Sequence, residues 1–310
     1  MTDPDLDVVI VGAGPAGLSA ALVLARCRRS VMVIDAGAGR NHHATSLHNF
    51  LTRDGIAPAD LRALGRDELA RHDVHFREGT AIDAHSTPPG FSVTYRPVPS
   101  VEPHAEISLT CRKLLLATGV TDVLPPIEGL LPLYGRSIHH CPYCDGWGHR
   151  DRRLAAYGSG DKGLGLALVL RNWSRDVVAC TDGELPSGDL RERAARAGVV
   201  VCVERLARVE GVDGRLERIL FAGGGAIERD AMFFNTGQVQ RSTLPSLLGC
   251  ATTDEGGVVT GDRQQTGVPG LYVAGDADRD VQFAIVAAGE GATAGVAINK
   301  ALQEDGIYAA

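Results

Sequence analysis

Basic residues and cysteine are both scarce in this sequence. Its 310 residues include 31 Lys and Arg against 38 Asp and Glu, which gives a formal net charge of −7. This balance argues against nucleic acid or an anionic membrane surface as a partner. The seven cysteines are too few, and odd in number, for a disulfide scaffold, so we expect a protein of the reducing cytoplasm. Five of them stand alone and are interpreted as small buried apolar residues: Cys27, Cys111, Cys180, Cys202 and Cys250.

An uninterrupted apolar segment of membrane-spanning length is also lacking. The stretch from Val8 to Ala25 carries no charge, but Gly12, Gly14, Pro15 and Gly17 interrupt it. Acidic residues precede it, whereas a signal peptide begins with basic ones. We therefore predict neither a membrane span nor a secretory leader. Hydrophobic residues make up 44% of the chain, which is enough for a large core and, at this length, for two domains.

Glycine is abundant, and many of the 38 glycines follow short apolar runs. Residues 7–35 read as a buried strand, a glycine turn, a helix and a second buried strand. Residues 154–180 repeat the same order. The repetition predicts an α/β fold with two Rossmann-like dinucleotide-binding domains.

The first glycine turn matches the dinucleotide fingerprint in spacing and in context. Gly12 permits the tight turn, Gly14 lets the backbone approach a pyrophosphate, and Gly17 lets the helix pack closely on the strand. The helix N-terminus supplies partial positive charge for the phosphates. Asp35 ends the next strand, at the distance where an acid binds ribose hydroxyls.

The far end of the chain indicates which dinucleotide is bound. Residues 270–276 form a predicted strand that ends in Gly275-Asp276, and an Ala-rich helix follows from Ala284. This segment resembles the second FAD motif of two-dinucleotide flavoproteins, in which the Asp holds the ribityl chain. FAD is therefore favoured over NAD in the first site.

Cys141 and Cys144 permit three interpretations: half of a zinc site, structural thiols, or a redox-active dithiol. For zinc, His139 and His140 are the near candidates, and their adjacency to Cys141 is poor geometry for a tetrahedral site. Pro142 and nearby glycines indicate an exposed turn rather than a core. The redox dithiol is favoured, since two thiols this close can close a small disulfide ring.

Proton transfer at such a pair needs an acid or base. Asp145 follows directly and is suited to protonate or deprotonate the reacting thiol. His139 and His140 are suited to the same role, but a plain surface position for at least one of them fits the sequence equally well. The predicted catalytic residues are Cys141, Cys144, Asp145 and His140, with no metal.

These motifs occur in the order found in the low-molecular-weight thioredoxin reductase family, which the chain resembles over nearly its whole length. The segments concerned are Gly12–Gly17, Ala117–Gly119, Cys141–Gly146, Gly158–Gly163 and Gly275-Asp276. The resemblance implies a homodimer with a discontinuous FAD domain, residues 1–117 and 245–310. It also implies an inserted NAD(P)-binding-like domain, residues 118–244, that carries the cysteines. Cys144 would face the flavin and Cys141 would meet the substrate. The implied FAD-binding residues are Gly12, Gly14, Pro15, Ala16, Gly17, Asp35, Ala117, Thr118, Gly119, Gly275, Asp276, Gln282, Phe283 and Ala284.

The sequence departs from that family in two places. After the second strand of the inserted domain, the reductases carry a His-Arg-Arg cluster for the 2′-phosphate of NADPH. Residues 178–184 here contain no Arg or Lys and two acids, Asp182 and Glu184, which argues against NADP(H) and gives no support for NAD(H). The family usually has Arg-Gln-Ala before the last helix, where this chain has Gln282-Phe283-Ala284.

Both departures resemble the dithiol oxidases of disulfide natural products, of the gliotoxin, holomycin and romidepsin type. In those enzymes a small-molecule dithiol reduces the cysteine pair, the pair reduces FAD, and oxygen reoxidises the flavin. We therefore predict an FAD-dependent dithiol oxidase. The alternatives are an NAD(P)H-dependent disulfide reductase with a thioredoxin-like partner, and a flavin-bound redox sensor without turnover.

Overall fold

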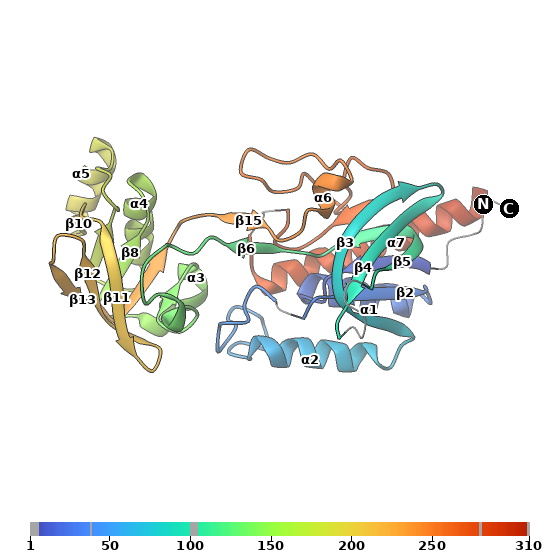
Figure 1. Cartoon of the computed structure of the whole chain (residues 1–310), viewed down its shortest axis with the longest axis horizontal. Helices are drawn as coiled ribbons and strands as arrows, with labels where there is room; N and C mark the ends of the chain where they lie inside the picture. Colours follow the sequence, from blue (N-terminus) through green and yellow to red (C-terminus); the bar gives the residue numbers. More distant parts are fainter. Residues whose placement is uncertain (1–5, 38, 100–104, 279–280, 309–310) are drawn as a thin grey trace. The chain divides into compact units, whose positions relative to one another are not determined.

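The computed structural model describes residues 6–37, 39–99, 105–278 and 281–308, and it divides the chain into two compact units (Figure 1). Unit 1 comprises residues 1–42, 49–121 and 239–310, and unit 2 comprises residues 43–48 and 122–238. Among the described residues, no helix is both long enough and apolar enough to cross a membrane.

Unit 1 is built on a parallel sheet with buried apolar strands. Val8, Ile10 and Leu115 are fully buried, as expected of a parallel sheet covered on both faces. The antiparallel strand β4 (Gly90–Pro97) pairs with extensions of β3 and β5. The parallel strands are, in spatial order, β3 (Val74–Thr87), β2 (Val31–Asp35), β1 (Leu6–Val11), β5 (Ile107–Leu116) and β16 (Leu271–Val273).

Two helices from opposite ends of the chain pack against each other in unit 1. They are α1 (Pro15–Arg26) and α7 (Ala284–Tyr308). A Cβ on Gly291 would overlap the carbonyl oxygen of Ala16, and one on Gly295 would lie 3.0 Å from Cβ of Val23. Glycine at these two positions therefore allows the close approach. The unit also contains α2 (Pro58–Leu69) and the short α6 (Leu244–Leu247).

Unit 2 repeats the parallel arrangement on a smaller scale. Its sheet has the spatial order β10 (Val200–Cys202), β9 (Val177–Cys180), β8 (Leu154–Tyr157), β14 (Ala231–Phe234) and β7 (Ile138–His139). Its helices are α4 (Asp161–Leu170), α5 (Gly188–Arg196) and the short α3 (Pro142–Asp145). Two single-turn 3-10 helices, Leu131–Leu133 and Gly146–His149, flank β7 and α3.

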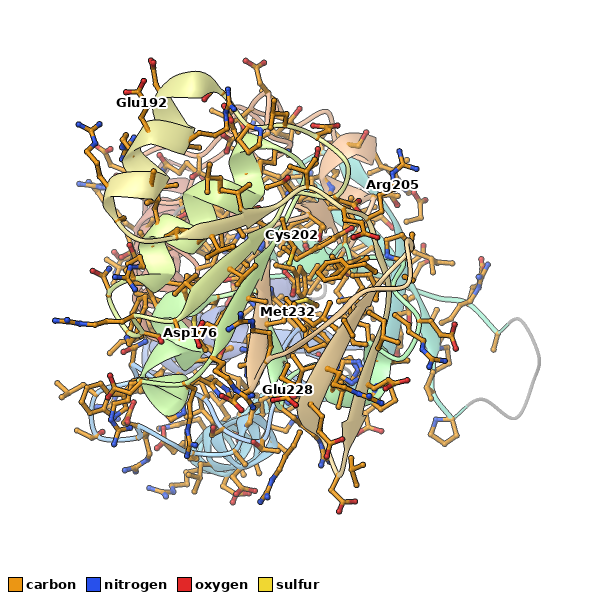
Figure 2. The ribbon with its side chains drawn as sticks, turned by 90° about the vertical axis from the view of Figure 1, so that its left-hand side faces the viewer. Asp176, Glu192, Cys202, Arg205, Glu228 and Met232 are labelled. Carbon is orange, nitrogen blue, oxygen red and sulfur yellow. A yellow bond between two sulfur atoms is a disulfide. The ribbon has the colours of Figure 1, made fainter. Side chains whose placement is uncertain are left out.

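An antiparallel meander covers one face of this sheet. Met232 of β14 is fully buried in the core between them (Figure 2). The meander consists of β11 (Leu206–Val212), β12 (Arg215–Phe221) and β13 (Ala226–Glu228). The connections between the units form a two-stranded sheet of β6 (Val120–Asp122) and β15 (Gln238–Gln240).

The isolated cysteines only partly follow the prediction. Cys111 and Cys180 are buried, and burial raises the pKa of each thiol to about 12, so both are inert thiols at neutral pH. Cys202 and Cys250 are half-buried. The prediction was wrong for Cys27, which is exposed because it is the C-cap residue of α1, just beyond the helix that enters the core.

Candidate functional site

The glycine turn between β1 and α1 has room for a pyrophosphate. A Cβ on Gly17 would overlap the carbonyl oxygen of Gly12, and Gly12 itself has a φ of +107°. A Cβ on Gly14 would meet nothing within 4 Å, and no side chain caps the N-terminus of α1, where Pro15 is the first residue. An open, uncapped helix N-terminus favours an anionic phosphate.

Asp35 lies against this turn. Its Oδ1 accepts a hydrogen bond from the backbone N–H of Ala13 at 3.1 Å, and its Oδ2 accepts one from Nη2 of Arg66 at 2.9 Å. An acid in this position binds the ribose hydroxyls of a dinucleotide. Arg66 comes from α2, 31 residues along the chain, so nothing in the local pattern indicated it.

The segment after β5 carries a buried polar atom that lacks a partner. The N–H of Ala117 donates to the carbonyl of Val11, which fixes the segment beside β1. Oγ1 of Thr118 is buried and has no hydrogen-bond partner within the described part of the chain. Leaving a buried hydroxyl unpaired costs about 1–3 kcal/mol. A polar atom of a ligand beside Gly119 would satisfy it.

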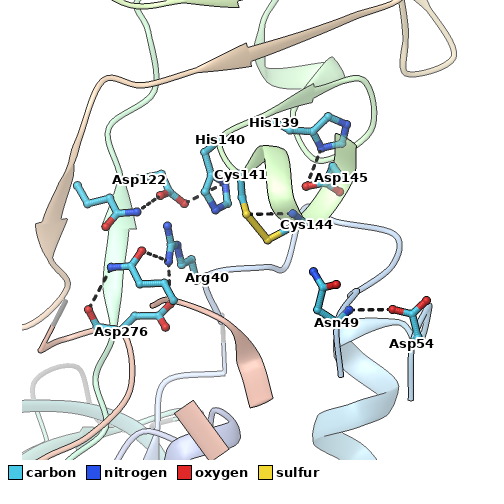
Figure 3. The surroundings of a disulfide bond; sticks show 12 residues. Arg40, Asn49, Asp54, Asp122, His139, His140, Cys141, Cys144, Asp145 and Asp276 are labelled. Atoms are coloured by element: carbon cyan, nitrogen blue, oxygen red, sulfur yellow. Dashed lines mark hydrogen bonds and ion pairs between the residues drawn. A yellow bond between two sulfur atoms is a disulfide. The ribbon is translucent and has the colours of Figure 1, made fainter. Parts of the chain in front are cut away.

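Asp276 and the start of α7 complete the predicted cofactor residues. A Cβ on Gly275 would lie 3.0 Å from that of Ala16, so this segment adjoins the glycine turn. Oδ2 of Asp276 accepts a hydrogen bond from Nη1 of Arg40 at 2.8 Å, and the same nitrogen donates to Oε1 of Gln282 at 2.7 Å (Figure 3). Arg40 was not predicted, because it lies more than 230 residues from both partners.

All the predicted cofactor residues lie in unit 1, at the carboxyl ends of parallel strands or at the starts of α1 and α7. Open α/β sheets bind their ligands at this edge. The uncapped turn at Gly14 favours a phosphate, and the unpaired hydroxyl of Thr118 needs a polar atom of a ligand. The residues therefore fit FAD.

Cys141 and Cys144 form a disulfide with a Cα–Cα distance of 5.3 Å. The exposed turn expected here is a half-buried helical turn, α3, because the ring of Trp173 packs so closely on Gly146 that a Cβ there would lie 2.7 Å from it. The N–H of Cys144 donates to Sγ of Cys141 at 3.1 Å. That hydrogen bond would stabilise negative charge on Cys141 after reduction.

His140 belongs to a network centred on a buried carboxylate. Its Nδ1 lies 3.7 Å from Oδ2 of Asp122, whose side chain is only 4% exposed. The hydroxyl of Tyr134 donates to the same oxygen at 3.0 Å, and Nε2 of Gln238 donates to the other oxygen at 3.1 Å. Figure 3 draws His140 next to Cys141. Asp122 thus orients the ring of a histidine beside the disulfide.

His139 belongs to a second network, with Asp145 and His149. Its Nδ1 lies 3.4 Å from Oδ2 of Asp145, and its Nε2 lies 2.9 Å from Nε2 of His149. Burial raises the pKa of Asp145. The hydrogen bond from His139 and the charges of His139, His140 and His48 lower the same pKa, and together they outweigh burial, so the pKa lies below its ordinary value. His139 is buried, so a surface position for it is excluded.

Burial and the charge of His139 lower the pKa of His149 to about 4. His149 is therefore neutral at neutral pH, and its Nε2 can accept a proton shared by His139. In Figure 3 the paired His139 and Asp145 are drawn across α3 from the disulfide. Within the described residues, no group of three or more His, Cys, Asp and Glu side chains is arranged to hold a metal ion.

The second glycine turn, between β8 and α4, differs from the first. A Cβ on Gly160 would lie 3.1 Å from Oε2 of Glu184, where the equivalent space at Gly14 is open. Asp161 stands in the first turn of α4, and Asp182 accepts a hydrogen bond from the hydroxyl of Tyr157 at 2.8 Å. The carboxylates of Glu184 and Asp161 therefore border the turn that a nucleotide phosphate would approach, and they fit a pyrophosphate poorly.

One cation from elsewhere in the chain reaches the loop after β9, which holds Asp182 and Glu184. Nε of Arg205, between β10 and β11, lies 2.9 Å from the position of a Cβ on Gly183. The segment 178–184, which contains no basic residue, gives no hint of it. The pairing arises because the N–H of Gly183 donates to the carbonyl of Val203 and holds the two segments together.

Comparison with known proteins identifies the family to which these features belong. The model of the pyridine nucleotide-disulphide oxidoreductase family matches residues 6–291. "Thioredoxin reductase tcpT" of Claviceps purpurea is 33% identical over 282 residues, which are 87% of this chain and 86% of that protein. The crystal structure of HlmI superposes with a TM-score of 0.91 at 33% identity, covering 98% of this chain and 94% of HlmI.

A putative thioredoxin reductase from Bacillus anthracis, TrxB, superposes with a TM-score of 0.88 at 30% identity and covers 97% of this chain and 99% of its own. The matched region includes the glycine turns, the disulfide and the first part of α7. The chain therefore belongs to the pyridine nucleotide-disulphide oxidoreductase family, as an FAD-binding, thioredoxin reductase-like oxidoreductase.

Proposed function

We propose that this protein is an FAD-dependent dithiol oxidase, which closes an intramolecular disulfide in a small-molecule dithiol of the natural-product type and passes the electrons to oxygen. The second glycine turn carries the proposal. Glu184 stands where a pyridine nucleotide would bring its pyrophosphate, and Asp161 adds a second carboxylate in the first turn of α4. An enzyme that takes its electrons from a dithiol does not need that site.

The disulfide accepts the electrons of the substrate. A substrate thiolate attacks Sγ of Cys141, and the Cys141–Cys144 bond breaks with its electron pair on Cys144. The second substrate thiolate then attacks the substrate sulfur of the mixed disulfide, which releases Cys141 and closes the new disulfide. The substrate loses two electrons and two protons, and the cysteine pair gains the two electrons. Bound FAD supplies two-electron transfer from the reduced pair to oxygen.

Two side-chain networks take up the protons. His140, oriented by Asp122, is the base that accepts the proton of the attacking thiol. Asp145 has a lowered pKa, which makes it a carboxylate at neutral pH and a weak base by itself. We assign uptake of the second proton to the pair that it forms with His139, whose Nδ1 lies 3.4 Å from its Oδ2. A substrate that arrives with two thiol protons suits a site with two acceptors.

A reductase that uses NADH or NADPH is the second candidate. Asp182 follows Gly158 by nearly the interval that separates Asp35 from Gly12, which is the position of a ribose-binding acid. Arg205 adds a cation beside the same loop. In that case the reduced pair would serve a disulfide partner such as a thioredoxin-like protein.

An anaerobic titration of the yellow holoprotein distinguishes the candidates. Dithiothreitol, NADPH and NADH are added separately, and the flavin absorbance band is followed. The oxidase should be bleached by about one equivalent of the dithiol, and air should restore the band with formation of hydrogen peroxide. Stoichiometric bleaching by either pyridine nucleotide would refute the oxidase.

Two cysteine variants test the role of the pair. Cys144→Ser should block bleaching by the dithiol, while Cys27→Ser, which changes an exposed cysteine outside the disulfide, should behave as wild type. Full turnover by Cys144→Ser would remove the pair from the mechanism. We further propose a cytoplasmic homodimer, which sedimentation of the purified protein and fractionation of its source cells would test.

A further inference from the structure

Arg40 is a nearly buried cation that the mechanism above does not use. It lies in the loop after β2, and its side chain is 9% exposed. Its Nη1 bridges Oδ2 of Asp276 and Oε1 of Gln282, at 2.8 and 2.7 Å (Figure 3). Nε2 of Gln282 also donates to the backbone carbonyl of Asp276 at 3.4 Å. One guanidinium thus ties the end of β16 to the segment that leads into α7.

The position of this bridge connects it with the cofactor. Asp276 directly follows Gly275, whose Cβ would touch that of Ala16 in the first turn of α1. Gln282 precedes the first residue of α7 by two positions. The bridge therefore lies between the pyrophosphate turn and the N-terminus of a long helix, and both of these favour negative charge.

The charge balance at this point depends on Arg40. With the pair intact, the carboxylate of Asp276 is compensated by the guanidinium, and α7 adds partial positive charge. Without Arg40, the negative charge of Asp276 is uncompensated, and the Asp276 side chain is only 20% exposed to solvent. Charges in such a place interact more strongly than charges in water.

We propose that Arg40 sets the reduction potential of the bound flavin by neutralising Asp276 at the head of α7. Reduction of a neutral flavin by two electrons and one proton adds one negative charge, which an uncompensated Asp276 would oppose. Arg40 consequently makes the flavin a better electron acceptor. The proposal requires FAD, which the family binds, and it holds for either direction of electron flow.

The test uses variants whose potentials should move in opposite directions. Each holoprotein is equilibrated with a reference redox dye under nitrogen, and the flavin midpoint potential is read from the two absorbance bands. Arg40→Met should shift the potential to more negative values, by at least tenfold in the equilibrium constant, or about 30 mV for a two-electron couple. Asp276→Asn should shift it to more positive values, and the double variant should lie between them.

Two further variants separate charge from architecture. Arg40→Lys keeps the charge and should hold the wild-type potential. Arg66→Met removes the matched Arg–Asp pair at the other end of the site, and it should weaken FAD retention without moving the potential. The proposal is overturned if Arg40→Met and Asp276→Asn shift the potential in the same direction, or if Arg40→Lys shifts it as far as Arg40→Met. Should Arg40→Met fail to retain FAD, Asp276→Asn and Arg40→Lys decide the question.

Discussion

The half-buried His149, which is neutral at neutral pH, makes the stability of unit 2 depend on pH. Its pKa is about 4 in the folded protein, against an ordinary value of 6.5. As the pH falls below about 6.5, the unfolded chain binds a proton at this residue and the folded chain does not. A group with a lowered folded pKa contributes stability that is present above the unfolded pKa and is lost as the pH falls towards the folded one.

The size of this loss follows from the two pKa values. Between about pH 7.5 and about pH 5, His149 alone removes about 2 kcal/mol from the free energy of unfolding. His149→Gln keeps an acceptor for Nε2 of His139 and has no proton to bind. The wild type should therefore lose about 2 kcal/mol more than the variant over this range.

Urea denaturation followed by tryptophan fluorescence measures the difference, because both tryptophans, Trp147 and Trp173, lie in unit 2. His85→Gln is the control, since it changes a histidine that is 62% exposed in unit 1. Parallel curves for wild type and His149→Gln would show that His149 does not stay neutral in the folded protein as the pH falls to about 5. The network that joins it to Asp145 would then need revision.

Three other predictions concern the two sites. His140→Gln should lower kcat for dithiol oxidation about 100-fold or more, because the base is lost. Asp122→Asn should lower kcat less, because it only removes the group that orients His140. An unchanged kcat of His140→Gln in stopped-flow assays would exclude His140 as the base. Gly17→Val should abolish FAD binding, because its side chain would overlap the carbonyl of Gly12, and the protein should purify colourless. Phe233→Ala should cost about 3–5 kcal/mol in urea denaturation, since Phe233 is fully buried beside the ring of His139; a loss below about 1 kcal/mol would contradict this packing.

The features that could be predicted from sequence are those that local chemistry dictates. A strand, a glycine turn and a helix are consecutive along the chain, so Gly12, Gly17 and Asp35 could be assigned from spacing. The exact bounds of the elements depend on tertiary pairing and could not be assigned in this way. Strand β3 continues to Thr87, because its antiparallel pairing with β4 extends that far. Helix α1 begins at Pro15, so the last residues of the glycine fingerprint are already helical.

The hydrogen-bond and ion-pair partners of the site residues could not be predicted in this way. Arg40 and Asp276, or Asp122 and Gln238, are joined only by the tertiary fold. The same holds for Arg205, which reaches the loop after β9 at Gly183 from the connection between β10 and β11. A charge in a loop has many potential partners in the sequence, and the sheet order selects one of them.

The packing of α1 on α7 has a consequence for synthesis of the protein. Unit 2 is complete once residue 238 has been translated, whereas unit 1 still lacks β16 and α7, which come later in the chain. Until α7 has been made, the face of α1 that packs against Gly291 and Gly295 is not covered by that helix. A nascent chain therefore has a finished cysteine-bearing unit while its cofactor-binding unit is still incomplete, so capture of FAD has to wait until α7 has been made. Limited supply of FAD during expression would accordingly lower the yield of folded protein by leaving unit 1 open to proteolysis.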